Sequence, residues 1–538
     1  MVHVVTGACC NDARCVTACP LDVIHPRPDE PEFATAEMLH IDPTTCIDCG
    51  ACADACPVDA IVPIDKLVPT QLHFAQVNAD YFAGRPVTPF SIGPTRAIPV
   101  LPPALGRLRV AIIGSGPAGM YAAEELLRHS DIDVDVFERL LTPWGLVRSG
   151  VAPDHPETKA VAATFETIAR ERNLRLRLGV DIGTDITVED LRERYHAVIV
   201  AAGAPTGRTL DIPGATRPGS VSAHEFAGWY NGHPDAADTT FDLSGTRAIV
   251  VGNGNVALDT ARILLTDPAL LAGTDIATHA LTALQHSRIE EVWILGRRGP
   301  RHCACTESEL TALATLPGLA IEVDPHTDLD PPRELDTDNA ALPRKLSFFR
   351  THTGTGSEGR KRIVFRFDTC VTSIDNDAPT LSVQISTPTT TEKVSAAVVI
   401  HAIGHDSHAI PGIPVLPGTT RTPHTNGRIT DDADGTPITG LYTVGWHKRG
   451  ATGVIGTNRY CSQDTVAALL ADFADGHLQQ PKHSAAALDS MLTARGIRPT
   501  DLRGWHRIDT EERRRGQATA RPRSKIVRRS ELATTAHP

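Results

Sequence analysis

The stretch Arg109–Glu138 constrains the fold of this chain most strongly. An aliphatic run leads into a glycine-rich turn, a helical pattern follows, and a second apolar run ends at Glu138. A strand, a glycine turn, a helix and a strand ending in an acid form a dinucleotide-binding fingerprint. Gly114 permits the tight turn, Gly116 lets the backbone approach a pyrophosphate, and Gly119 allows close helix packing. An ordinary glycine turn is the alternative, but every element stands where the fingerprint requires it.

A second fingerprint of the same kind occupies Arg247–Arg262. An aliphatic run again enters a glycine turn and a helical pattern, which read Gly252-Asn253-Gly254-Asn255-Val256-Ala257. Alanine in the third position still allows close packing of helix and strand. Two such folds in one chain indicate two nucleotides, one held tightly and one that exchanges.

The residues after the next apolar run indicate which nucleotide the second fold binds. The run Glu291–Gly296 is followed by Arg297 and Arg298, where an acid would select NAD through its ribose hydroxyl. Two arginines instead suit the 2′-phosphate of NADP. The alternative is a pair of exposed arginines that merely end a strand.

Two later stretches indicate that the chain returns to the first nucleotide fold. Val398–Gly404 is a second apolar run, and Leu441–Asn458 is rich in glycine. Its segment Gly450–Gly456 would bring a helix N-terminus towards a flavin ring. Trp446 offers that ring a flat surface for stacking.

Eight of the twelve cysteines lie before residue 57, which in a reducing compartment points to metal or iron–sulfur ligation rather than disulfides. Cys46, Cys49, Cys52 and Cys56 form the run CxxCxxCxxxCP, which is the ligand spacing of bacterial ferredoxins. Zinc is the alternative, but zinc sites usually use two separated cysteine pairs. The run therefore predicts an iron–sulfur cluster.

The earlier run matches the same template, except that its second position is an acid. Cys9, Cys15 and Cys19 align with it, and Asp12 stands where a cysteine is expected. A carboxylate is a harder ligand than a thiolate, so this site could hold a three-iron cluster or a four-iron cluster with Asp12 as ligand. The crossover rule assigns Cys56 to this cluster and Cys19 to the other.

Charge and hydropathy exclude several classes of protein. Residues 1–65 hold eleven acids against two bases, and the whole chain carries a net charge of −12. This acidic head either docks on a basic face or is simply solvated. We expect no nucleic-acid binding. We also expect no membrane insertion, because no apolar run reaches the roughly 18 residues needed for a span. The start of the chain does not read as a secretory signal, which favours a cytoplasmic protein.

The expected fold class is α/β, with an N-terminal α+β bacterial ferredoxin domain and two Rossmann-like dinucleotide-binding domains. Residues 84–107 contain six prolines, which predict an extended and semi-rigid spacer. The expected divisions are a two-cluster ferredoxin domain at 1–65, a Pro-rich linker at 66–107, an FAD-binding domain at 108–210 and 401–480, an NADP-binding domain at 211–400, and a C-terminal extension packed on the reductase at 481–538.

From about residue 108 onward, the chain resembles the adrenodoxin reductase type of ferredoxin–NADP reductase. With its cysteine-rich segment in front, nearly the whole chain resembles the mycobacterial-type fusion of a ferredoxin to such a reductase. The motifs that carry this resemblance are Gly114–Gly119, Glu138, Gly145–Arg148, Asp154-His155, Gly252–Arg262, Arg297–Pro300 and Gly445–Asn458.

The resemblance implies a set of cofactor-binding residues. Those expected at FAD are Gly114, Gly116, Ala118, Gly119, Glu138, Leu146, Val180, Trp446, Gly453, Val454 and Ile455. Those expected at NADP are Asn253, Gly254, Asn255, Val256, Arg297, Arg298 and Glu309. His155 and Glu309 would lie near the nicotinamide and assist in handling protons. The expected metal ligands are Cys9, Asp12, Cys15, Cys19, Cys46, Cys49, Cys52 and Cys56.

Three places depart from the family pattern. The insert Pro26–Glu37 is longer than in bacterial ferredoxins. Cys303 and Cys305 stand where the family usually has apolar residues, and we interpret them as a local substitution rather than a metal site. His447 stands beside the tryptophan where an aliphatic residue is more usual.

The resemblance implies an NADPH:ferredoxin oxidoreductase with FAD, NADP(H) and two iron–sulfur clusters, one 4Fe–4S and the other 3Fe–4S or 4Fe–4S. Hydride from NADPH would reach FAD, and single electrons would pass to iron–sulfur centres of the chain, of a partner ferredoxin or of another one-electron acceptor. Two alternatives stay open at this point: an electron-input subunit resembling the small subunit of glutamate synthase, and a non-catalytic iron–sulfur redox sensor.

Overall fold

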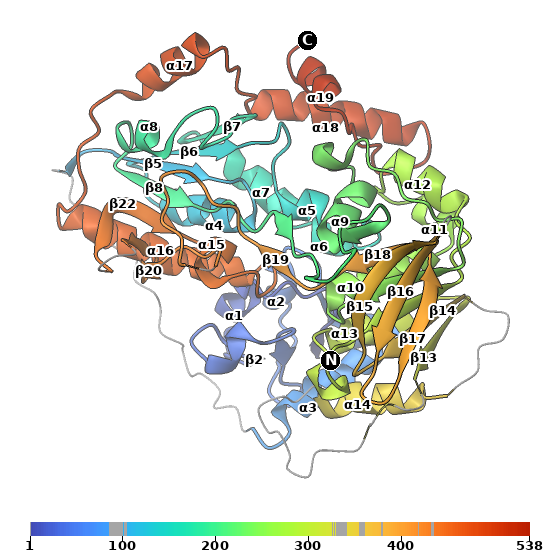
Figure 1. Ribbon diagram of the computed structural model, residues 1–538. Coiled ribbons are helices and arrows are strands. Elements are labelled where there is room, and N and C mark those ends of the chain that lie inside the picture. The colour runs from blue at the N-terminus through green and yellow to red at the C-terminus, as the bar shows by residue number, and fades with distance from the viewer. Residues whose placement is uncertain are drawn as a thin grey trace.

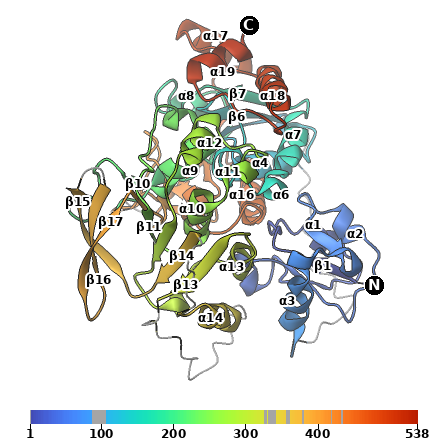
Figure 2. The same cartoon turned by 90° about the vertical axis from the view of Figure 1, so that its right-hand side faces the viewer.

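The structure is a computed structural model that describes residues 2–85, 101, 105–324, 327, 329, 342–354, 361–377, 380–417, 419–431 and 435–538. Figure 1 shows two large units built on parallel sheets, with a small N-terminal unit below them in that view. Figure 2 shows the N-terminal unit lying against the side on which α13 is found. The arrangement confirms the expected α/β class.

The N-terminal unit consists of two short antiparallel strand pairs and two short helices. β1 pairs with β4, and β2 pairs with β3. The bounds are β1 (His3–Val5), α1 (Arg14–Ala18), β2 (Ile24–His25), β3 (His40–Ile41), α2 (Ala51–Asp54) and β4 (Ile61–Pro63).

The backbone of this unit repeats itself with an offset of 37 residues. Left-handed conformations occur in three pairs with that separation: Asn11 and Asp48, Ala13 and Gly50, and Asp22 and Asp59. Asparagine, aspartate and glycine tolerate this conformation, whereas an alanine adopts it only under strain. The two cysteine loops therefore have the same local shape, and Asp12 takes the place in its loop that Cys49 takes in the other.

The expected linker at 66–107 contains a helix, which lies before the stretch 84–107 that is expected to be extended. α3 (His73–Phe82) packs against β1 and β3. The buried Asn78 amide explains this packing, because it accepts a hydrogen bond from Val5 N and donates one to Val5 O. Most of the Pro-rich stretch that follows, residues 86–100 and 102–104, lies outside the described residues.

The first large unit is built on a seven-stranded sheet. Its order is β20-β21-β22-β8-β5-β6-β7, and the strands from β22 to β7 are parallel. The strand bounds are β5 (Leu108–Ile113), β6 (Ile132–Glu138), β7 (Leu174–Leu178), β8 (Ala197–Val200), β20 (His424–Thr425), β21 (Arg428–Thr430) and β22 (Pro437–Thr443). Its helices include α4 (Pro117–Leu126), α7 (Ala162–Ala169), α8 (Val188–Arg192) and α16 (Thr457–Ala474).

Two stretches were expected to return to the first nucleotide fold, and the parallel pairing of β22 with β8 confirms this for Leu441–Asn458. The expectation is wrong for Val398–Gly404, because Val398–His401 pairs with Arg247–Val251 in the other large sheet. α16 follows β22 and packs along α4, which follows β5. Ser462 Oγ donates a hydrogen bond to Ala118 O, 2.8 Å away, which ties the two helices together near the glycine turn.

The second large unit is built on a six-stranded parallel sheet of order β10-β18-β11-β12-β14-β13. Its strands are β10 (Ser220–Ser222), β11 (Arg247–Val251), β12 (Glu291–Leu295), β13 (Leu319–Val323), β14 (Lys361–Arg366) and β18 (Val398–His401). Its helices are α9 (Ala223–Asn231), α10 (Asn255–Leu265), α11 (Pro268–Leu271), α12 (Thr278–Gln285), α13 (Glu307–Ala314) and α14 (Leu342–Thr351).

The chain crosses between the large units twice, and the two crossings pair with each other. β9 (Thr206–Gly207) runs antiparallel to β19 (His405–Asp406). A three-stranded antiparallel sheet extends from the second unit and is formed by β15 (Cys370–Asp377), β16 (Thr380–Ser386) and β17 (Thr391–Ala396). Figure 2 shows this sheet on the side away from the N-terminal unit.

The C-terminal segment contacts both large units. It contains α17 (Ala485–Ala494), α18 (Leu502–Gln517) and α19 (Arg529–Ala536). Glu512 is fully buried and forms a two-point ion pair with Arg148 of the first unit. Lys525 pairs with Asp275 of the second unit at 2.9 Å. Among the residues that the structure describes, no helix is long and apolar enough to cross a membrane.

Candidate functional site

The first glycine turn packs tightly against neighbouring backbone at Gly114 and Gly119, but it leaves open space next to Gly116. Gly114 has φ +108°, and a Cβ there would lie 2.5 Å from Ala201 O. A Cβ on Gly119 would lie 2.0 Å from Gly114 O. A Cβ on Gly116 would meet nothing within 4 Å, so open space stands over the N-terminus of α4. Unpaired N–H groups at a helix start suit a phosphate.

Glu138 lies beside this turn, at the end of the neighbouring strand β6. Its carboxylate accepts hydrogen bonds from Ser115 N at 3.1 Å, Ser115 Oγ at 2.8 Å and Leu140 N at 3.1 Å. Val180 N donates to Glu138 O at 2.9 Å, which places Val180 next to the acid. A carboxylate held at this position can accept hydrogen bonds from a ribose.

Two loops reach the same turn from other parts of the chain. A Cβ on Gly145 would lie 3.0 Å from Gly116 Cα, and α5 (Leu146–Ser149) begins directly after it. From the returning segment, a Cβ on Gly445 would lie 2.5 Å from Ala118 Cβ. α15 (Trp446–Arg449) begins there, so Trp446 lies at the edge of the glycine turn.

The returning segment has polar atoms that lack a partner within the described part of the chain. Trp446 Nε1 donates to Thr452 O at 3.1 Å, and Val454 N donates to Thr457 Oγ1 at 3.2 Å. Gly453 has φ +81° and lies between these two contacts. Nε and Nη1 of Arg449 are buried without a hydrogen-bond acceptor among the described residues. Open space beside a glycine turn with unsatisfied donors nearby fits a bound dinucleotide, so the residues expected at FAD suit that group.

The second glycine turn has the same construction. Gly252 has φ +117°, and a Cβ there would lie 2.1 Å from Ala402 O. Around Gly254 the only atom near a Cβ would be Ala304 Cβ, 3.9 Å away, so the start of α10 is open. Val256, one residue into that helix, is 36% exposed although it is apolar. The space suits a second phosphate-bearing ligand.

Arg297 and Arg298 lie directly after β12, the neighbour of β11 in the sheet. Both are exposed. Their place matches that of Glu138 after β6 in the first unit, so a cation pair stands here where the other fold has an acid. No hydrogen bond or ion pair joins either guanidinium to another residue within the described ranges, so both are available to a ligand phosphate.

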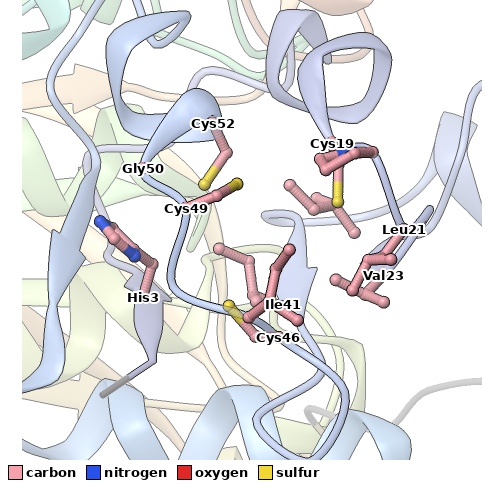
Figure 3. Close-up of a pocket in the computed structure, with 12 residues that line it drawn as sticks. His3, Cys19, Leu21, Val23, Ile41, Cys46, Cys49, Gly50 and Cys52 are labelled. Carbon is pink, nitrogen blue, oxygen red and sulfur yellow. The ribbon is translucent and has the colours of Figure 1, made fainter.

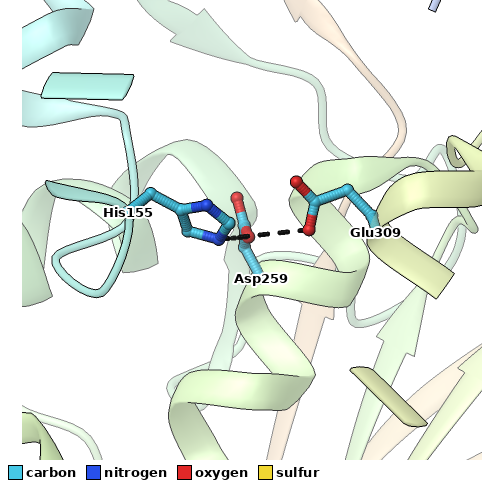
Figure 4. Close-up of side chains that lie close together, drawn as sticks. All are labelled: His155, Asp259 and Glu309. Atoms are coloured by element: carbon cyan, nitrogen blue, oxygen red, sulfur yellow. Dashed lines mark ion pairs between the residues drawn. The ribbon is translucent and has the colours of Figure 1, made fainter. Parts of the chain in front are cut away.

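His155, Asp259 and Glu309 come together between the two large units, as Figure 4 shows. His155 Nε2 lies 3.5 Å from Asp259 Oδ1 and 4.0 Å from Glu309 Oε2. His155 precedes α6 (Pro156–Lys159), Asp259 lies on α10, and Glu309 lies on α13. Arg262, one turn along α10, pairs with both Asp259 and Asp154.

Burial and neighbouring charges shift the pKa values within this cluster. Burial and the charge of Arg262, whose Nη2 contacts His155 Nε2, disfavour the charged form of His155, but the hydrogen bond to Asp259 and the charges of Asp259 and Glu309 outweigh them and raise its pKa. Burial together with the charge of Asp259 raises the pKa of Glu309. Burial opposes ionisation of Asp259, yet Arg262 and His155 lower its pKa. The cluster therefore favours a charged imidazole beside a carboxyl group that binds a proton more readily than usual.

Sequence reasoning identified His155 and Glu309 but missed Asp259 and Arg262. Both lie on the helix that follows the second glycine turn, three residues apart. Residues with that spacing share one helix face. The sequence could therefore have predicted that Asp259 and Arg262 share a helix face. It could not have predicted their contact with His155, which lies more than a hundred positions earlier in the chain.

One cysteine set lies at the outer end of the N-terminal unit. Cys19, Cys46, Cys49 and Cys52 line one cavity, which Figure 3 shows. Cys49 is exposed, and Ile47 between the first two loop cysteines is 61% exposed. The set joins one cysteine of the first run to three of the second, as the crossover rule expects.

The other cysteine set lies at the inner end, against the first large unit. Cys9, Cys15 and Cys56 influence one another electrostatically, and burial raises the pKa of the Cys9 thiol to about 12. Cys9 and Cys56 pack against the apolar core that includes Tyr121 of α4. Four-sulfur and three-sulfur sets with this spacing match the ligand chemistry of iron–sulfur clusters.

Asp12 lies beside the inner cysteines, but its carboxylate is engaged by an arginine. Oδ1 accepts from Arg14 N at 3.2 Å, and Oδ2 accepts from Arg14 Nε at 3.0 Å. The same guanidinium pairs with Glu124 of α4 at 2.6 Å. The arginine therefore links Asp12 to the first large unit.

The inner loop docks on the start of α16. Gly456 N donates to Cys10 O at 2.7 Å, and Arg459 Nη1 donates to Asp12 O at 3.0 Å. A Cβ on Gly456 would lie 2.2 to 2.3 Å from Asp12 N, the Asn11 carbonyl carbon and Cys10 O. The backbones are in direct contact, only two residues from Val454. Sequence reasoning could not place this contact, because its partners are more than 440 residues apart.

The acidic insert contacts the second large unit. Glu37 Oε1 accepts from Lys345 Nζ at 2.8 Å, and Arg344 Nη1 approaches Asp80 Oδ2 at 3.5 Å. The expectation that the acidic head docks on basic side chains holds at Glu37, whereas Asp80 lies on α3, outside residues 1–65.

Two protein families and several known proteins are similar to this chain. The pyridine nucleotide-disulphide oxidoreductase family matches residues 108–295, and the 4Fe-4S binding domain family matches residues 39–62. A probable ferredoxin/ferredoxin–NADP reductase of Mycobacterium tuberculosis is 45% identical over 553 residues, covering 100% of this chain and 95% of that protein. The NADPH-ferredoxin reductase FprA of Mycobacterium leprae is 40% identical over 458 residues, covering 80% of this chain and 98% of that protein.

A more distant relative and a solved structure agree with this. The mitochondrial NADPH:adrenodoxin oxidoreductase of Bos taurus is 38% identical over 460 residues, covering 79% of this chain and 91% of that protein. The structure of Mycobacterium tuberculosis FprA in complex with NADPH matches with a TM-score of 0.74 and 38% identity. It covers 80% of this chain and 100% of that chain.

The charge of His155 can be tested directly by titration. We expect its imidazole to titrate above the ordinary value of 6.5, because its carboxylate neighbours outweigh burial. Asp259→Asn removes the hydrogen-bonding carboxylate and leaves burial, so the pKa should fall. NMR of protein with isotope-labelled histidine measures both, and the signal is assigned by its absence in His155→Gln.

Asp475→Asn, an exposed substitution at the end of α16, serves as the control and should leave the titration unchanged. A wild-type His155 that titrates below 6.5, or one that is indifferent to Asp259→Asn, would contradict the geometry of the cluster.

Proposed function

The chain belongs to the ferredoxin/ferredoxin–NADP reductase family, and from that premise we propose how its own residues carry out NADPH:ferredoxin oxidoreduction. The protein is an oxidoreductase that transfers electrons between NADPH and ferredoxin, with FAD, NADP and a 4Fe–4S cluster as cofactors. A bound flavin supplies the exchange between two-electron hydride transfer and one-electron transfer. One observation carries the proposal: both glycine turns are open, His155 of the first large unit meets Asp259 on the helix that follows the second turn, and a cysteine-rich unit docks beside the first turn.

We propose that the turn at Gly252–Ala257 binds NADP. Asn253, Gly254, Asn255 and Val256 line the open start of α10, which suits the pyrophosphate. The exposed guanidinium groups of Arg297 and Arg298 suit the 2′-phosphate, because a planar guanidinium binds phosphate oxygens in pairs.

The turn at Gly114–Gly119 would then hold FAD. Glu138 is placed to bind the ribose, as its position after β6 requires. Leu146, Val180, Trp446 and the stretch Gly453–Ile455 would surround the bound flavin and exclude water from it. Exclusion of water strengthens every electrostatic interaction inside the site.

His155, Asp259 and Glu309 would handle protons at the gap between the two units. The raised pKa of His155 favours an imidazolium there, and Asp259 fixes the orientation of the ring. Glu309 holds a proton more readily than an exposed glutamate because burial and Asp259 raise its pKa. His155 as a proton donor and Glu309 as a proton acceptor, side by side, can keep the local charge balanced as nucleotide enters and leaves.

The inner cysteine set would hold a three-iron cluster. Cys9, Cys15 and Cys56 supply three thiolates, which is the donor set that such a cluster requires. Asp12 occupies the fourth ligand position in the loop, but Arg14 engages both of its carboxylate oxygens. A carboxylate committed to an arginine is a poor competitor for iron.

The outer cysteine set would hold the four-iron cluster, and the surface around it would be where a partner protein exchanges electrons. The inner loop is covered by α16 and α4, whereas Cys49 and Ile47 face solvent. An exposed apolar residue within an acidic unit suits a partner with a basic rim around an apolar centre.

The proposed divisions follow the expected boundaries, with one revision. The ferredoxin-like domain extends beyond residue 65 to include α3, and the FAD-binding parts at 108–210 and 401–480 share one sheet. The NADP-binding part occupies 211–400, and the segment 481–538 braces both. Contacts of Glu512 and Lys525 support the last assignment.

Preference for NADPH over NADH tests the nucleotide assignment. Anaerobic mixing with NADPH should bleach the flavin absorbance, and NADH should bind far more weakly. Arg297→Ala combined with Arg298→Ala should raise the Kd for NADPH about 10- to 100-fold, since each removes a charge-assisted hydrogen bond. Affinity for NADH should stay unchanged. Equal affinities for the two nucleotides in the wild type would contradict the assignment.

Substitution of Asp12 tests the cluster type. Asp12→Cys should add one iron atom per chain and abolish the electron paramagnetic resonance signal that an oxidised three-iron cluster gives. Iron analysis and low-temperature spectra of the oxidised protein measure both. Asp65→Cys, at an exposed residue outside both cysteine runs, is the control and should change neither. A wild type that already lacks the three-iron signal would show that Asp12 is a ligand or that the site differs.

Ile47 tests the exchange surface. Ile47→Ser should lower the rate of electron transfer to cytochrome c, a basic one-electron acceptor, by about tenfold, because exposed apolar anchors contribute about 1 kcal/mol or more at interfaces. Flavin bleaching by NADPH should be unaffected. Leu270→Ser, at a residue 57% exposed on the second large unit, is the matched control. Equal effects of the two substitutions would place the exchange surface elsewhere.

A further inference from the structure

The loop Cys303–Thr306 braces the second glycine turn. Cys303 Sγ donates a hydrogen bond to Asn253 O at 3.4 Å, and Ala304 N donates to Asn253 Oδ1 at 3.4 Å. Thr306 N donates to Asn255 Oδ1 at 2.8 Å. Both asparagines belong to the turn that the proposed function assigns to NADP. The loop therefore fixes the shape of that turn.

The other side of the same loop contacts the ferredoxin-like domain. Lys345 Nζ donates to Cys305 O at 2.8 Å and to Glu37 Oε1 at 2.8 Å. Glu307 N donates to Glu37 Oε2 at 2.8 Å. The loop thus touches the nucleotide turn directly through Asn253, and Lys345 bridges its Cys305 carbonyl to Glu37 of the docked domain.

The loop carries two thiols in contact with each other. The sulfur atoms of Cys303 and Cys305 lie 3.1 Å apart. Cys303 is 7% exposed and Cys305 is fully buried, and the residues on either side of Cys303, His302 and Ala304, are exposed. Cys303 is therefore the thiol nearer to solvent, with its partner directly behind it.

The electrostatic surroundings favour reaction at the outer thiol. A hydrogen bond from Cys305 lowers the pKa of Cys303, and the nearby Lys345 ammonium acts in the same direction. The hydrogen bond to Cys303 together with burial raises the pKa of Cys305. The thiolate is the nucleophile in disulfide exchange, so Cys303 is the attacking group and Cys305 the resolving one.

A metal site is not the explanation of this pair. Within the described ranges, the only set of three or more His, Cys, Asp or Glu ligand atoms close enough to hold an ion is His155, Asp259 and Glu309. The cysteines have each other and no third ligand. Neither thiol has a part in the proposed electron transfer.

We propose that Cys303 and Cys305 form a reversible disulfide that weakens NADP binding and loosens the contact with Glu37. The oxidant is a low-molecular-weight disulfide. The Cys303 thiolate attacks one of its sulfur atoms and expels one thiol, and Cys305 then attacks the mixed disulfide and expels the second. Two protein thiols lose two protons and two electrons, and the oxidant is reduced to two thiols. The effect on NADP rests on the proposed function of this turn.

The geometry explains why a disulfide would disturb both contacts. An S–S bond is about 2.0 Å long, so the sulfur atoms must approach by about 1 Å from their present separation. Movement of Cys303 Sγ removes its hydrogen bond to Asn253 O, and movement of the backbone shifts Ala304 N and Cys305 O. The nucleotide turn then loses its hydrogen bonds from Cys303 and Ala304, and Lys345 loses its hydrogen bond to Cys305 O.

The test equilibrates the holoenzyme anaerobically in buffers of reduced and oxidised glutathione, followed by acid quenching, alkylation and mass spectrometry. Both thiols should alkylate at the reducing end, and neither should at the oxidising end. Calorimetric titration with NADP⁺ should show affinity about tenfold lower at the oxidising end, since one or two hydrogen bonds of about 1 kcal/mol are lost. Hydrogen exchange of residues 34–40 should rise in parallel.

Variants identify the residues responsible. In Cys303→Ser and in Cys305→Ser, the affinity for NADP⁺ should be the same at both ends of the series. Cys370→Ser, at a half-buried cysteine on β15, should respond as the wild type does. Thiols that stay open to alkylation at the oxidising end overturn the proposal, as does a disulfide that leaves NADP⁺ affinity unchanged. Failure of the reduced holoenzyme to bind NADP⁺ would instead contradict the nucleotide site, and it would be seen before any oxidant is added.

Discussion

The backbone contact between Gly456 and the Cys10–Asp12 loop is the constraint on which the rest of the arrangement depends. The amide of Gly456 donates to Cys10 O, and no side chain fits at that glycine without displacing the loop. Arg14 and Arg459 extend the contact by joining the loop to α4 and α16. Because α16 starts directly after the stretch expected at the flavin, this contact fixes the inner cysteines beside it. The outer cysteine set is consequently left at the free end of its unit, with Cys49 exposed where a partner can approach.

The two nucleotide folds have the same glycine turn and helix start, but they carry side chains of opposite charge at the end of the neighbouring strand. In each, a glycine with φ above +100° makes a turn that no other residue could make, and a second glycine leaves the following helix start open. Glu138 ends the neighbouring strand in one fold, and Arg297 lies two residues beyond it in the other. In the proposed function, this difference selects a ribose hydroxyl in the first fold and a ribose phosphate in the second. His155, Asp259 and Glu309 then lie where the two folds meet.

The sequence motifs predicted the individual nucleotide folds and cysteine loops of this protein. The contacts between these units depend on residues far apart in the chain and could not be predicted. The glycine turns, the acid after β6 and the cysteine spacing were readable because each is set by a few neighbouring residues. Asp259 and Arg262 were also within reach, since their spacing puts them on one helix face. The contact at Gly456 was not, because it joins positions more than 440 residues apart and has no signal in either segment. α3 was missed because the prolines after it suggested an extended linker, whereas Asn78 holds the helix on β1.

The most direct test of this account is the rate at which NADPH reduces the iron–sulfur centres of Gly456→Ala, measured by anaerobic stopped-flow spectroscopy with Gly273→Ala as control. Gly456 has φ −71°, so alanine suits the backbone and only the added methyl group acts, through collision with the Cys10–Asp12 loop. At Gly273 the nearest atom to an added Cβ is Leu270 O at 3.7 Å, an ordinary contact. The account predicts that flavin bleaching keeps its wild-type rate in both variants, while cluster bleaching slows at least tenfold in Gly456→Ala alone. Cluster bleaching at the wild-type rate in Gly456→Ala would contradict it.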